Sequence, residues 1–599
     1  MPDFYDEEEK DRLKGDVKIP FRVLLRRMLA YVRPEIGSFI FAGFLLLLNV
    51  VLDVAIPLIF SHITDTLTSE VIDLHLVIML AVGAFVVGVV NNLFIYVESM
   101  VLQKAGQRII YTLRTDVFTH IEGMSQNQFS EMPVGSLVTR VASYTQSMCD
   151  LFTNVIVSVI RNLVTIVGVY AIMFFVSWQL ACLMLIPITV IFLASLVFSH
   201  YESRAFRDER KRISDLNAFL NENLSGMKIT QIFNREEKKA AEFDEKNDSH
   251  RRSVFRIVLG FGIYRPFVTF VYVATIALIF YFGVKYGLSP GGVVAFYLYL
   301  GKFFNPVQQL ADQLNNIHKA TSASERLFNL LDVQPDVRDL PDAVDLTDVK
   351  GRIEFKHVWF AYVGEDWILR DVSFVIEPGD TCAFVGATGA GKTTILSLIV
   401  RNYEIQRGTI EIDGQDISKI RIKSLRRAIG QMLQDVFLFS GTIKTNVSLH
   451  DETIPDEKIV EACRYVGADS FIEKLPDKYE AQVIERGENF SQGQRQLLSF
   501  ARTVLHRPRV LILDEATANI DAETEVLIQE SLEKMRSIGT MLVVAHRLST
   551  IQHADQIIVL QKGEIIERGT HQELLAKHGY YWKLYCLQFE GGEKQTSEA

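Results

Sequence analysis

A glycine-rich stretch in the second half of the chain has the residue types and spacing needed to bind phosphate groups. It lies between the apolar run 381–385 and the apolar run 395–400. Glycines let backbone N–H groups turn towards phosphate oxygens, and the amino end of a following helix adds its positive dipole end. A strand, a glycine loop, Lys-Thr and a helix together are typical of a P-loop. Its predicted ATP-binding residues are Gly386, Ala387, Thr388, Gly389, Ala390, Gly391, Lys392, Thr393 and Thr394.

Two acidic residues end a second apolar run, roughly 120 residues further along the chain. Asp514 and Glu515 follow Val510-Leu-Ile-Leu513, which has the composition of a buried strand. Asp514 fits a Mg²⁺-binding role beside Thr393, and Glu515 can polarise the attacking water. A strand that ends in Asp-Glu is weak evidence alone. Together with the P-loop, it predicts an ATP-hydrolysing site in which Lys392 reaches the β- and γ-phosphates.

The composition divides the chain of 599 residues into two halves. Apolar residues make up 49% of it, but long apolar runs are concentrated in residues 35–315, whereas residues 335–599 resemble a soluble α/β protein. The net charge of −10 argues against nucleic acid as a main partner, because phosphate-backbone binding needs a clustered basic face. The five scattered cysteines show no metal-ligand spacing and are interpreted as reduced, structural thiols.

Six stretches are long and apolar enough to be read as membrane-spanning helices. They are residues 36–60, 74–97, 154–176, 178–198, 258–282 and 292–316, the sixth being the weakest by hydropathy. The first 20 residues are polar and lack the apolar region of a cleavable signal peptide, so the first span is expected to direct insertion. Lys and Arg are concentrated before the first span and after the second and fourth, which predicts that both termini are cytoplasmic.

The connections 100–153 and 199–257 are too long for turns and are expected to continue the helices of the spans, for example over Ala205–Phe219 and Glu236–Phe243. Residues 21–33 are predicted to form a basic amphipathic helix at the inner membrane surface. The predicted organisation is a cytoplasmic N-terminus (1–34), a transmembrane domain (35–325), a linker (326–350), a nucleotide-binding domain (351–588) and a polar tail (589–599).

Five charged residues lie within or beside the predicted spans, namely Asp53, Glu98, Arg161, Arg265 and Lys302. Charged groups are costly in lipid, so they could line a polar translocation path. The alternative is pairing between helices or extension towards the membrane interface. Both interpretations stay open at this stage.

The chain resembles a half-transporter of the ATP-binding cassette (ABC) superfamily, in the exporter-type arrangement of six helices followed by one cassette. The feature specific to that family is Phe490-Ser491-Gln492-Gly493-Gln494, about 20 residues before Asp514, where the usual signature is Leu-Ser-Gly-Gly-Gln. The resemblance implies an all-α transmembrane domain with long intracellular helices, followed by an α/β P-loop nucleotide-binding domain. It also implies that Ser491, Gln492, Gly493 and Gln494 contact ATP held by a second cassette.

The same resemblance assigns further roles. Tyr362 is similar to the aromatic residue that stacks on adenine, and Gln434 to the Q-loop glutamine that joins Mg²⁺ to the membrane half. Asp521 resembles the D-loop aspartate, and His546 the switch histidine that touches the γ-phosphate. The implied Mg²⁺ ligands are thus Thr393, Gln434 and Asp514. Weaker matches to segments that couple the two halves are Gly135 and Arg140, Glu222 and Gly226, and Glu485-Arg486-Gly487.

The departure in the signature suggests that this chain pairs with a different subunit. Gln492 replaces a glycine where backbone and phosphate approach closely, whereas Glu515 and His546 are present. Heterodimeric bacterial multidrug exporters divide such defects between their subunits, and this chain resembles the subunit that keeps the catalytic glutamate. The resulting expectation is ATP-driven export of amphiphilic small molecules, multidrug or lipid-like, across the cell membrane. The alternatives are a homodimeric lipid flippase or an importer of metal chelates with the same fold.

Overall fold

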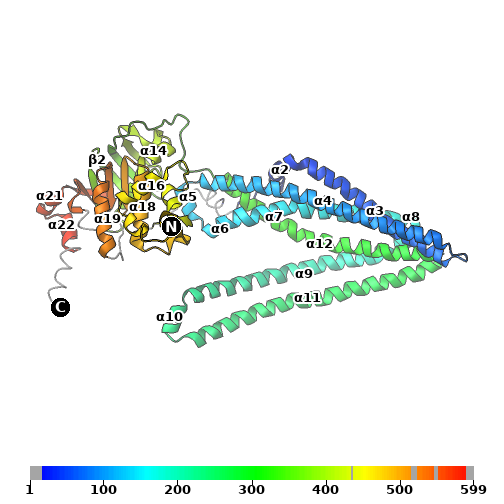
Figure 1. Cartoon of the computed structure of the whole chain (residues 1–599). Helices are drawn as coiled ribbons and strands as arrows, with labels where there is room; N and C mark the ends of the chain where they lie inside the picture. Colours follow the sequence, from blue (N-terminus) through cyan, green and yellow to red (C-terminus); the bar gives the residue numbers. More distant parts are fainter. Residues whose placement is uncertain (1–11, 13–16, 433–435, 515–521, 545–550, 588–599) are drawn as a thin grey trace. The chain divides into compact units, whose positions relative to one another are not determined.

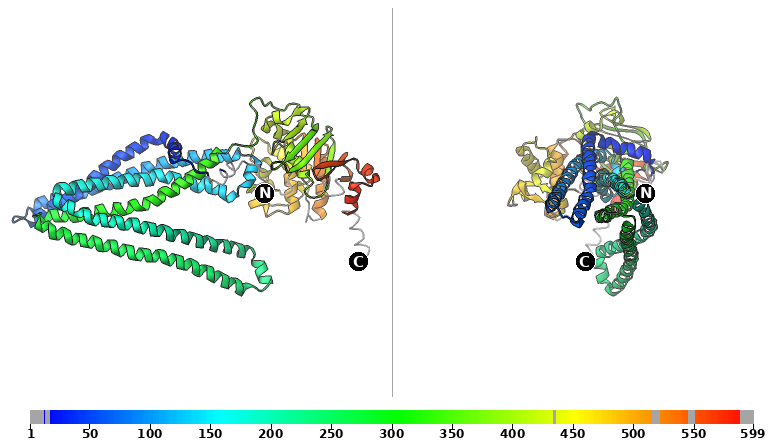
Figure 2. Two further views of the ribbon diagram at one scale, coloured as in Figure 1. Left: turned by 180° about the vertical axis from the view of Figure 1, so that it is seen from behind. Right: turned by 90° about the vertical axis from the view of Figure 1, so that its right-hand side faces the viewer.

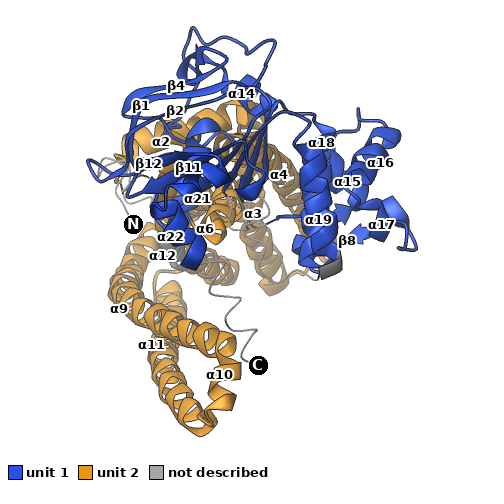
Figure 3. Ribbon diagram, turned by 90° about the vertical axis from the view of Figure 1, so that its left-hand side faces the viewer, with its two compact units in different colours: residues 1–13, 121–132, 333–599 blue, residues 14–120, 133–332 orange. Residues whose placement is uncertain are grey.

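The computed structural model describes residue 12 and residues 17–432, 436–514, 522–544 and 551–587. Contacts within the chain divide it into two compact units, which Figure 3 shows in different colours. Unit 1 comprises residues 1–13, 121–132 and 333–599, and unit 2 comprises residues 14–120 and 133–332. Unit 2 consists of helices, and unit 1 combines sheets with helices.

Unit 2 is built from long helices joined by short connections (Figure 1). Its elements are α2 (Phe21–Val32), η1 (Arg33–Glu35), α3 (Ile36–Thr68), α4 (Leu74–Glu122), α6 (Val134–Thr139), η2 (Arg140–Tyr144), α7 (Thr145–Asp150), η3 (Leu151–Ile156), α8 (Val157–Val176), α9 (Trp178–Ser225), α10 (Met227–Ile232), α11 (Glu236–Lys285) and α12 (Pro290–Asp332). In a helix the backbone N–H and C=O groups bond to each other, and this is needed in lipid because lipid tails offer no hydrogen-bond partners.

Five helical stretches of the described residues are long and apolar enough to cross a membrane. They are Phe21–Thr68, Leu74–Glu122, Val134–Val176, Trp178–Ser225 and Glu236–Lys285. Many large apolar side chains on them are exposed, for example Phe85 at 73% and Phe175 at 87%, as a lipid-facing surface requires. α12 does not belong to this set, so a sixth span over residues 292–316 stays a prediction.

The predicted continuation of the spans as long helices is confirmed by α9 and α11, which have 48 and 50 residues. They run side by side and are closed by α10 at one end (Figures 1 and 2). The pair is held by Phe198 stacked on Tyr264 with centroids 4.1 Å apart. Further along, Arg256 pairs with Asp208 at 2.8 Å. These contacts make the two helices a stiff arm.

A single residue, Ser177, separates α8 from α9. Its φ of −159° breaks the helix, and its Oγ accepts a hydrogen bond from the Leu180 backbone N–H at 3.5 Å. Serine at this position caps the new helix and satisfies one of its free donors. α8 and α9 are therefore joined by a tight turn at Ser177.

Four of the five charged residues of the spans form ion pairs between helices. Arg161 Nη2 on α8 lies 2.5 Å from Glu98 Oε1 on α4, and the Glu98 side chain is fully buried. Lys302 Nζ on α12 lies 2.5 Å from Asp53 Oδ1 on α3. This arrangement favours the pairing interpretation for these four, because each charge in a poorly solvated place has an opposite charge beside it.

The described residues of unit 1 form three sheets. Their strands are β1 (Ile353–Ala361), β2 (Trp367–Ile376), β3 (Thr381–Val385), β4 (Arg407–Ile412), β5 (Gln415–Asp416), β6 (Ile429–Met432), β7 (Gly441–Thr442), β8 (Gln482–Val483), β9 (Val510–Asp514), β10 (Thr540–Val544), β11 (Gln556–Gln561) and β12 (Glu564–Gly569). The main sheet has the order β12-β11-β3-β10-β9-β6, and all its strands except β12 pair in parallel. An antiparallel sheet has the order β2-β1-β4-β5, and β7 pairs with β8.

Both faces of the main sheet are covered, which explains the continuous apolar runs seen in the sequence. All five residues of β3 are buried, and so are those of β10. Ala383 and Val385 belong to one apolar core, whereas Cys382 and Phe384 belong to the other. Successive side chains of a strand point to opposite faces, so a strand covered on both faces must be apolar throughout.

The helices that cover these sheets are mostly short. Those of unit 1 include α5 (Gln126–Glu131), α13 (Lys392–Ile399), α14 (Ile422–Ala428), α15 (Ile443–Ser448), α16 (Asp456–Tyr465), α17 (Asp469–Ile472), α18 (Gln492–Leu505), α19 (Ala522–Met535), α21 (His571–Ala576) and α22 (Tyr580–Tyr585). The 3-10 turns η4 (Ile417–Lys419) and η6 (Glu485–Gly487) precede α14 and α18. α18 lies against α15, α16 and α19.

α12 continues to Asp332, beyond residue 325 where the sequence analysis ended the transmembrane domain. Helical spacing continues through Leu327, Phe328 and Leu330, and all three are buried. At its end, Asp332 accepts hydrogen bonds from Arg27 of α2. These buried side chains and this ion pair stabilise the helix over residues 326–332, which the sequence analysis assigned to the linker.

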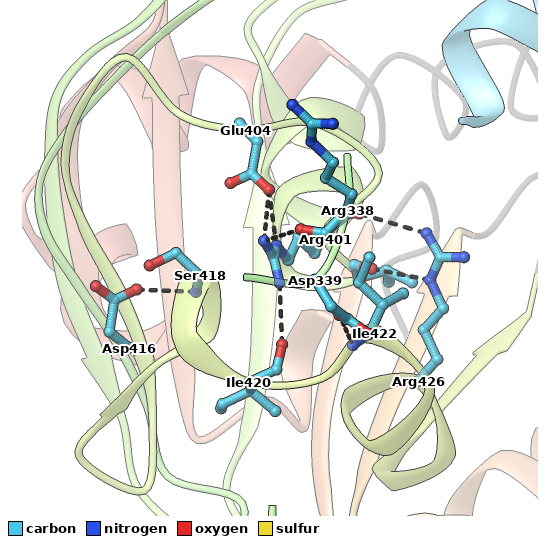
Figure 4. A network of polar contacts seen from close by, with 10 residues as sticks. Arg338, Asp339, Arg401, Glu404, Asp416, Ser418, Ile420, Ile422 and Arg426 are labelled. Atoms are coloured by element: carbon cyan, nitrogen blue, oxygen red, sulfur yellow. Dashed lines mark hydrogen bonds and ion pairs between the residues drawn. The ribbon is translucent and has the colours of Figure 1, made fainter. Parts of the chain in front are cut away.

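The segment that follows Asp332, which begins the C-terminal part of unit 1, contacts the rest of that unit along part of its length (Figure 4). Arg401 is almost fully buried, and its guanidinium donates to Arg338 O at 3.1 Å, to Ile420 O at 2.9 Å and to Glu404 at 2.8 Å. The Asp339 carboxylate accepts from the Ile422 backbone N–H at 2.8 Å. One arginine thus joins this segment to the end of the P-loop helix.

We predict that Arg401→Leu destabilises unit 1 by about 2 kcal/mol, because three acceptors lose a charged donor and two of them are main-chain carbonyls. Thermal unfolding and hydrogen exchange of the full-length chain would measure this loss. Arg370→Leu is the control, since Arg370 is exposed on β2 and its side chain forms no ion pair in the structure as described. Equal stability of the two variants would contradict the prediction.

Candidate functional site

The predicted phosphate loop lies between the carboxyl end of β3 and the amino end of α13. β3 is central in the main sheet, with β10 and β11 on its two sides. α13 begins at Lys392, and its N-cap is Gly391. The loop backbone therefore leads from a rigid strand directly into a helix, whose free N–H groups are suited to phosphate.

Glycine is required at two positions of this loop for different reasons. A Cβ on Gly386 would lie 2.3 Å from the Leu560 carbonyl oxygen, so the neighbouring strand β11 leaves no room for a side chain. Gly391 has a φ of +102°, and a Cβ there would lie 2.7 Å from Leu369 Cδ2. Left-handed backbone and close packing both exclude other residues at Gly391.

Lys392 lies across the loop. Its side chain is mostly buried, and its Nζ donates to Gly386 O at 2.7 Å and to Ala387 O at 3.1 Å. Burial lowers the pKa of Lys392 below its ordinary value, while the nearby Asp514 carboxylate opposes that shift. The ammonium is therefore held inside the loop, where the phosphates of a nucleotide would be bound.

The two threonines after Lys392 point to different surroundings. Thr393 is exposed, whereas Thr394 is buried and its hydroxyl lies 3.0 Å from the Tyr362 hydroxyl. The Tyr362 ring packs edge-on against Phe360 and Tyr403, with centroid distances of 4.9 and 5.2 Å. Tyr362 is therefore fixed beside the P-loop helix.

Asp514 ends β9, and β10 lies between that strand and β3. Parallel strands present their carboxyl ends at one edge, so Asp514 and the P-loop share that edge. The exposed Thr393 hydroxyl and the Asp514 carboxylate are oxygen donors, the ligand type that Mg²⁺ prefers. Gln434, Glu515, Asp521 and His546, which the sequence analysis also assigned to this site, lie outside the described residues.

The predicted signature begins α18. Ser491 is its N-cap, and Ser491 and Gln494 form a reciprocal capping box with distances of 3.2 and 3.0 Å. Phe490 is buried and packs against Phe471, so its replacement of leucine changes the core of unit 1. Gln492 is exposed, whereas Gly493 is buried. Of the two departures from the usual motif, only Gln492 presents a side chain to solvent.

The segments weakly matched to coupling regions lie in several places. Gly135 lies in α6, Arg140 is buried in η2, and Gly226 caps the end of α9 after Glu222. Glu485, Arg486 and Gly487 form η6, where Arg486 has a φ of +58°.

Sequence reasoning missed a polar network around α5. Gln128 is fully buried, and its Nε2 donates to Gln334 O at 2.7 Å and to Asp336 Oδ1 at 2.9 Å. Ser125 caps α5 and forms a capping box with Gln128. The capping box is recognisable in the sequence as Ser-x-x-Gln. The contact of Gln128 with the segment after α12 has no such local pattern.

Comparisons with known proteins agree with this geometry. The ABC transporter transmembrane region family matches residues 39–307, and the ABC transporter family matches residues 369–518. A probable multidrug resistance ABC transporter ATP-binding/permease protein of Bacillus subtilis, YheH, is 39% identical over 83% of this chain and 74% of that protein. An ATP-dependent lipid A-core flippase of Syntrophus aciditrophicus is 34% identical over 83% of both chains.

A solved structure of a bacterial Atm1-family ABC exporter with ATP bound is also similar. The TM-score is 0.76 at 25% identity, and the match covers 92% of this chain and 98% of that one. The chain belongs to the ABC transporters. Its fold is that of an Atm1-like exporter, and its ATP-binding domain makes it an ATPase coupled to transport. The predicted fold class and enzyme class are thus confirmed.

We predict that Gly391→Ala weakens ATP binding by about tenfold, because a left-handed backbone and a clash with Leu369 must both be relieved at the phosphate loop. Binding of a fluorescent ATP analogue to the full-length chain would measure the change. Gly379→Ala is a matched control, since Gly379 also has a positive φ (+86°) but a Cβ there meets open space. Similar ATP affinities for the two variants would contradict the prediction.

Proposed function

We propose that this chain is one half of a heterodimeric ABC exporter that moves amphiphilic small molecules, multidrug or lipid-like, out of the cell. The observation that carries the proposal is a complete phosphate loop combined with a signature altered at Gln492. The names of the relatives support the substrate class, since they include a multidrug resistance transporter and a lipid flippase. Both termini and unit 1 are assigned to the cytoplasm.

In this proposal the phosphate loop of this chain forms the working ATP site. Backbone N–H groups of residues 386–394 and the Lys392 ammonium bind the phosphates, and Tyr362 lies against the adenine. Thr393, Gln434 and Asp514 hold Mg²⁺, which neutralises phosphate charge when bound. Glu515 acts as the base towards the attacking water, and His546 contacts the γ-phosphate. Asp521 is assigned the role of the D-loop aspartate that it resembles.

An exposed apolar surface at the end of the α9–α11 arm supports a dimer. Leu224, Ile229, Ile232 and Phe233 are 63–69% exposed around α10. Several large apolar side chains exposed in one short segment are typical of a contact site with another protein. Unit 1 also exposes about half of Phe437 and of Phe439, which lie edge to face 5.2 Å apart. A second subunit could cover both of these exposed apolar surfaces.

The signature decides between a homodimer and a heterodimer in this proposal. In a homodimer, Gln492 would face ATP at both sites, and its exposed side chain would stand where a glycine normally allows close approach. In a heterodimer it faces only one ATP, and the phosphate loop of this chain meets the partner's intact signature. The flippase relative supports a second candidate, a homodimeric lipid flippase.

We predict that Glu515→Gln reduces ATP hydrolysis by at least about a hundredfold while ATP still binds, because the amide cannot accept a proton from water. Phosphate release and nucleotide binding by the full-length transporter would be measured on the same preparation. Glu525→Gln, an acid-to-amide change in α19, is the matched control. Retained turnover in Glu515→Gln would refute its role as the base.

Expression of the chain without a partner tests the heterodimer. We expect low ATP turnover for the chain alone and an increase in turnover for Gln492→Gly, because the substitution restores close approach at the signature. Mass measurement in lipid nanodiscs would report the oligomeric state, and an ATPase assay would report the turnover of the chain and of the variant. A stable homodimer with normal ATPase and transport activity would reject the heterodimer and leave the flippase candidate.

A further inference from the structure

A surface pocket of about 890 Å³ on unit 1 has a strongly basic lining. Its cationic side chains are Arg421, Lys423, Arg427, Arg507 and Arg509, and His506 lies with them. Asp345 and Asp348 are the acidic residues among the lining residues described. Five cations against two carboxylates form a local excess of positive charge in a chain whose net charge is −10.

The pocket lies at the edge of the main sheet opposite the phosphate loop. Ala428 immediately precedes β6, and Arg509 immediately precedes β9. Both strands run in the same direction as β3, whose carboxyl end leads into the phosphate loop. Residues before the amino ends of these strands are therefore separated from the ATP site by the length of the strands.

Three of the pocket's cations form no ion pair with another described residue. Lys423, Arg427 and Arg509 are exposed, and the described part of the chain offers none of them an ion-pair partner. The neighbouring Arg426 differs, because its guanidinium donates to Val400 O at 3.3 Å and to Asn402 Oδ1 at 3.2 Å. Like charges gathered in a concave surface raise the local positive potential, which attracts an anion.

An intramolecular carboxylate already occupies one corner of the pocket. Asp345 Oδ2 accepts from Arg421 Nη1 at 2.8 Å. The backbone on both sides of Asp345 is bound to the same region, since Arg421 N donates to Val344 O at 2.9 Å and Leu346 N donates to Ser424 Oγ at 2.9 Å. The segment that follows α12 thus forms one wall of the pocket.

We propose that this pocket binds a soluble polyphosphate, such as a nucleoside polyphosphate, which competes with Asp345 for Arg421. Arginine guanidinium groups bind phosphate through paired hydrogen bonds, and unpaired cations provide the remaining charge. Leu346, Val349 and Ala428 supply an apolar surface for a ring, and the volume lies in the range of small-molecule sites. Binding there changes the contacts of the segment between α12 and β1, because Asp345 belongs to that segment.

The test uses the full-length chain in nanodiscs of neutral lipid, with the phosphate loop filled by a saturating non-hydrolysable ATP analogue. Tripolyphosphate is the probe, and calorimetry measures its binding. We expect Lys423→Glu and Arg427→Glu each to weaken binding by about tenfold, since each replaces an attraction by a repulsion near the anion. Lys474→Glu is the matched control, because Lys474 is an exposed lysine of unit 1 outside the pocket.

Each outcome decides the proposal. Binding that falls with salt, weakens in Lys423→Glu and persists in Lys474→Glu supports it. Absence of binding once the phosphate loop is filled, or equal weakening by both lysine variants, overturns it. A second arm repeats the titration in nanodiscs that contain phosphatidylglycerol. Competition by this lipid in the wild type but not in Lys423→Glu would assign the phosphate to lipid headgroups and overturn a soluble ligand.

Discussion

The phosphate loop must approach two neighbouring strands very closely, and the arrangement of unit 1 depends on that constraint. Gly386 lies against the backbone of β11, and Gly391 lies against Leu369 of β2. The loop can hold this shape only if β3 is fixed between β10 and β11 and if the antiparallel sheet lies beside it. The same shape directs the loop carbonyls at Lys392 and encloses its ammonium. Stiff packing around the loop therefore prepares the nucleotide site before a nucleotide binds.

A different constraint governs unit 2, because lipid offers no hydrogen bonds and poorly solvates charge. Its long helices satisfy their own backbone groups, and Glu98 and Asp53 each find a basic partner on another helix. The stiff α9–α11 arm carries an exposed apolar end at α10. Such a surface is costly in water, so it is best explained by contact with a second subunit.

The segment after α12 is a bound element of unit 1 for much of its length. Gln128 binds it near its start, Arg401 binds it at Arg338, and Arg421 binds it at Asp345. Of these contacts, the Arg421–Asp345 ion pair is exposed on both sides, so an anion can compete for it more easily than for the buried contacts of Gln128 and Arg401. A connection of this kind can respond to ligands, whereas a flexible linker has no defined contacts to lose.

Local pattern was sufficient for much of this protein. The phosphate loop, the Asp-Glu strand end, the signature and the long helices are each written in a few consecutive residues or in a regular period, because backbone conformation there follows from nearby residues. The roles assigned to the individual site residues stay predictions, and four of these residues, Gln434, Glu515, Asp521 and His546, lie outside the described residues.

Contacts between residues far apart in the chain could be decided only by the tertiary structure. Asp53 and Lys302 are separated by 249 positions, and Gln128 and Asp336 by 208. No local pattern specifies which opposite charge or carbonyl a side chain will meet, since that depends on how the helices and strands pack. The sequence by itself determined an ABC-type ATPase with a membrane half. Packing decided which charges are paired, where the segment after α12 is bound and where five cations gather.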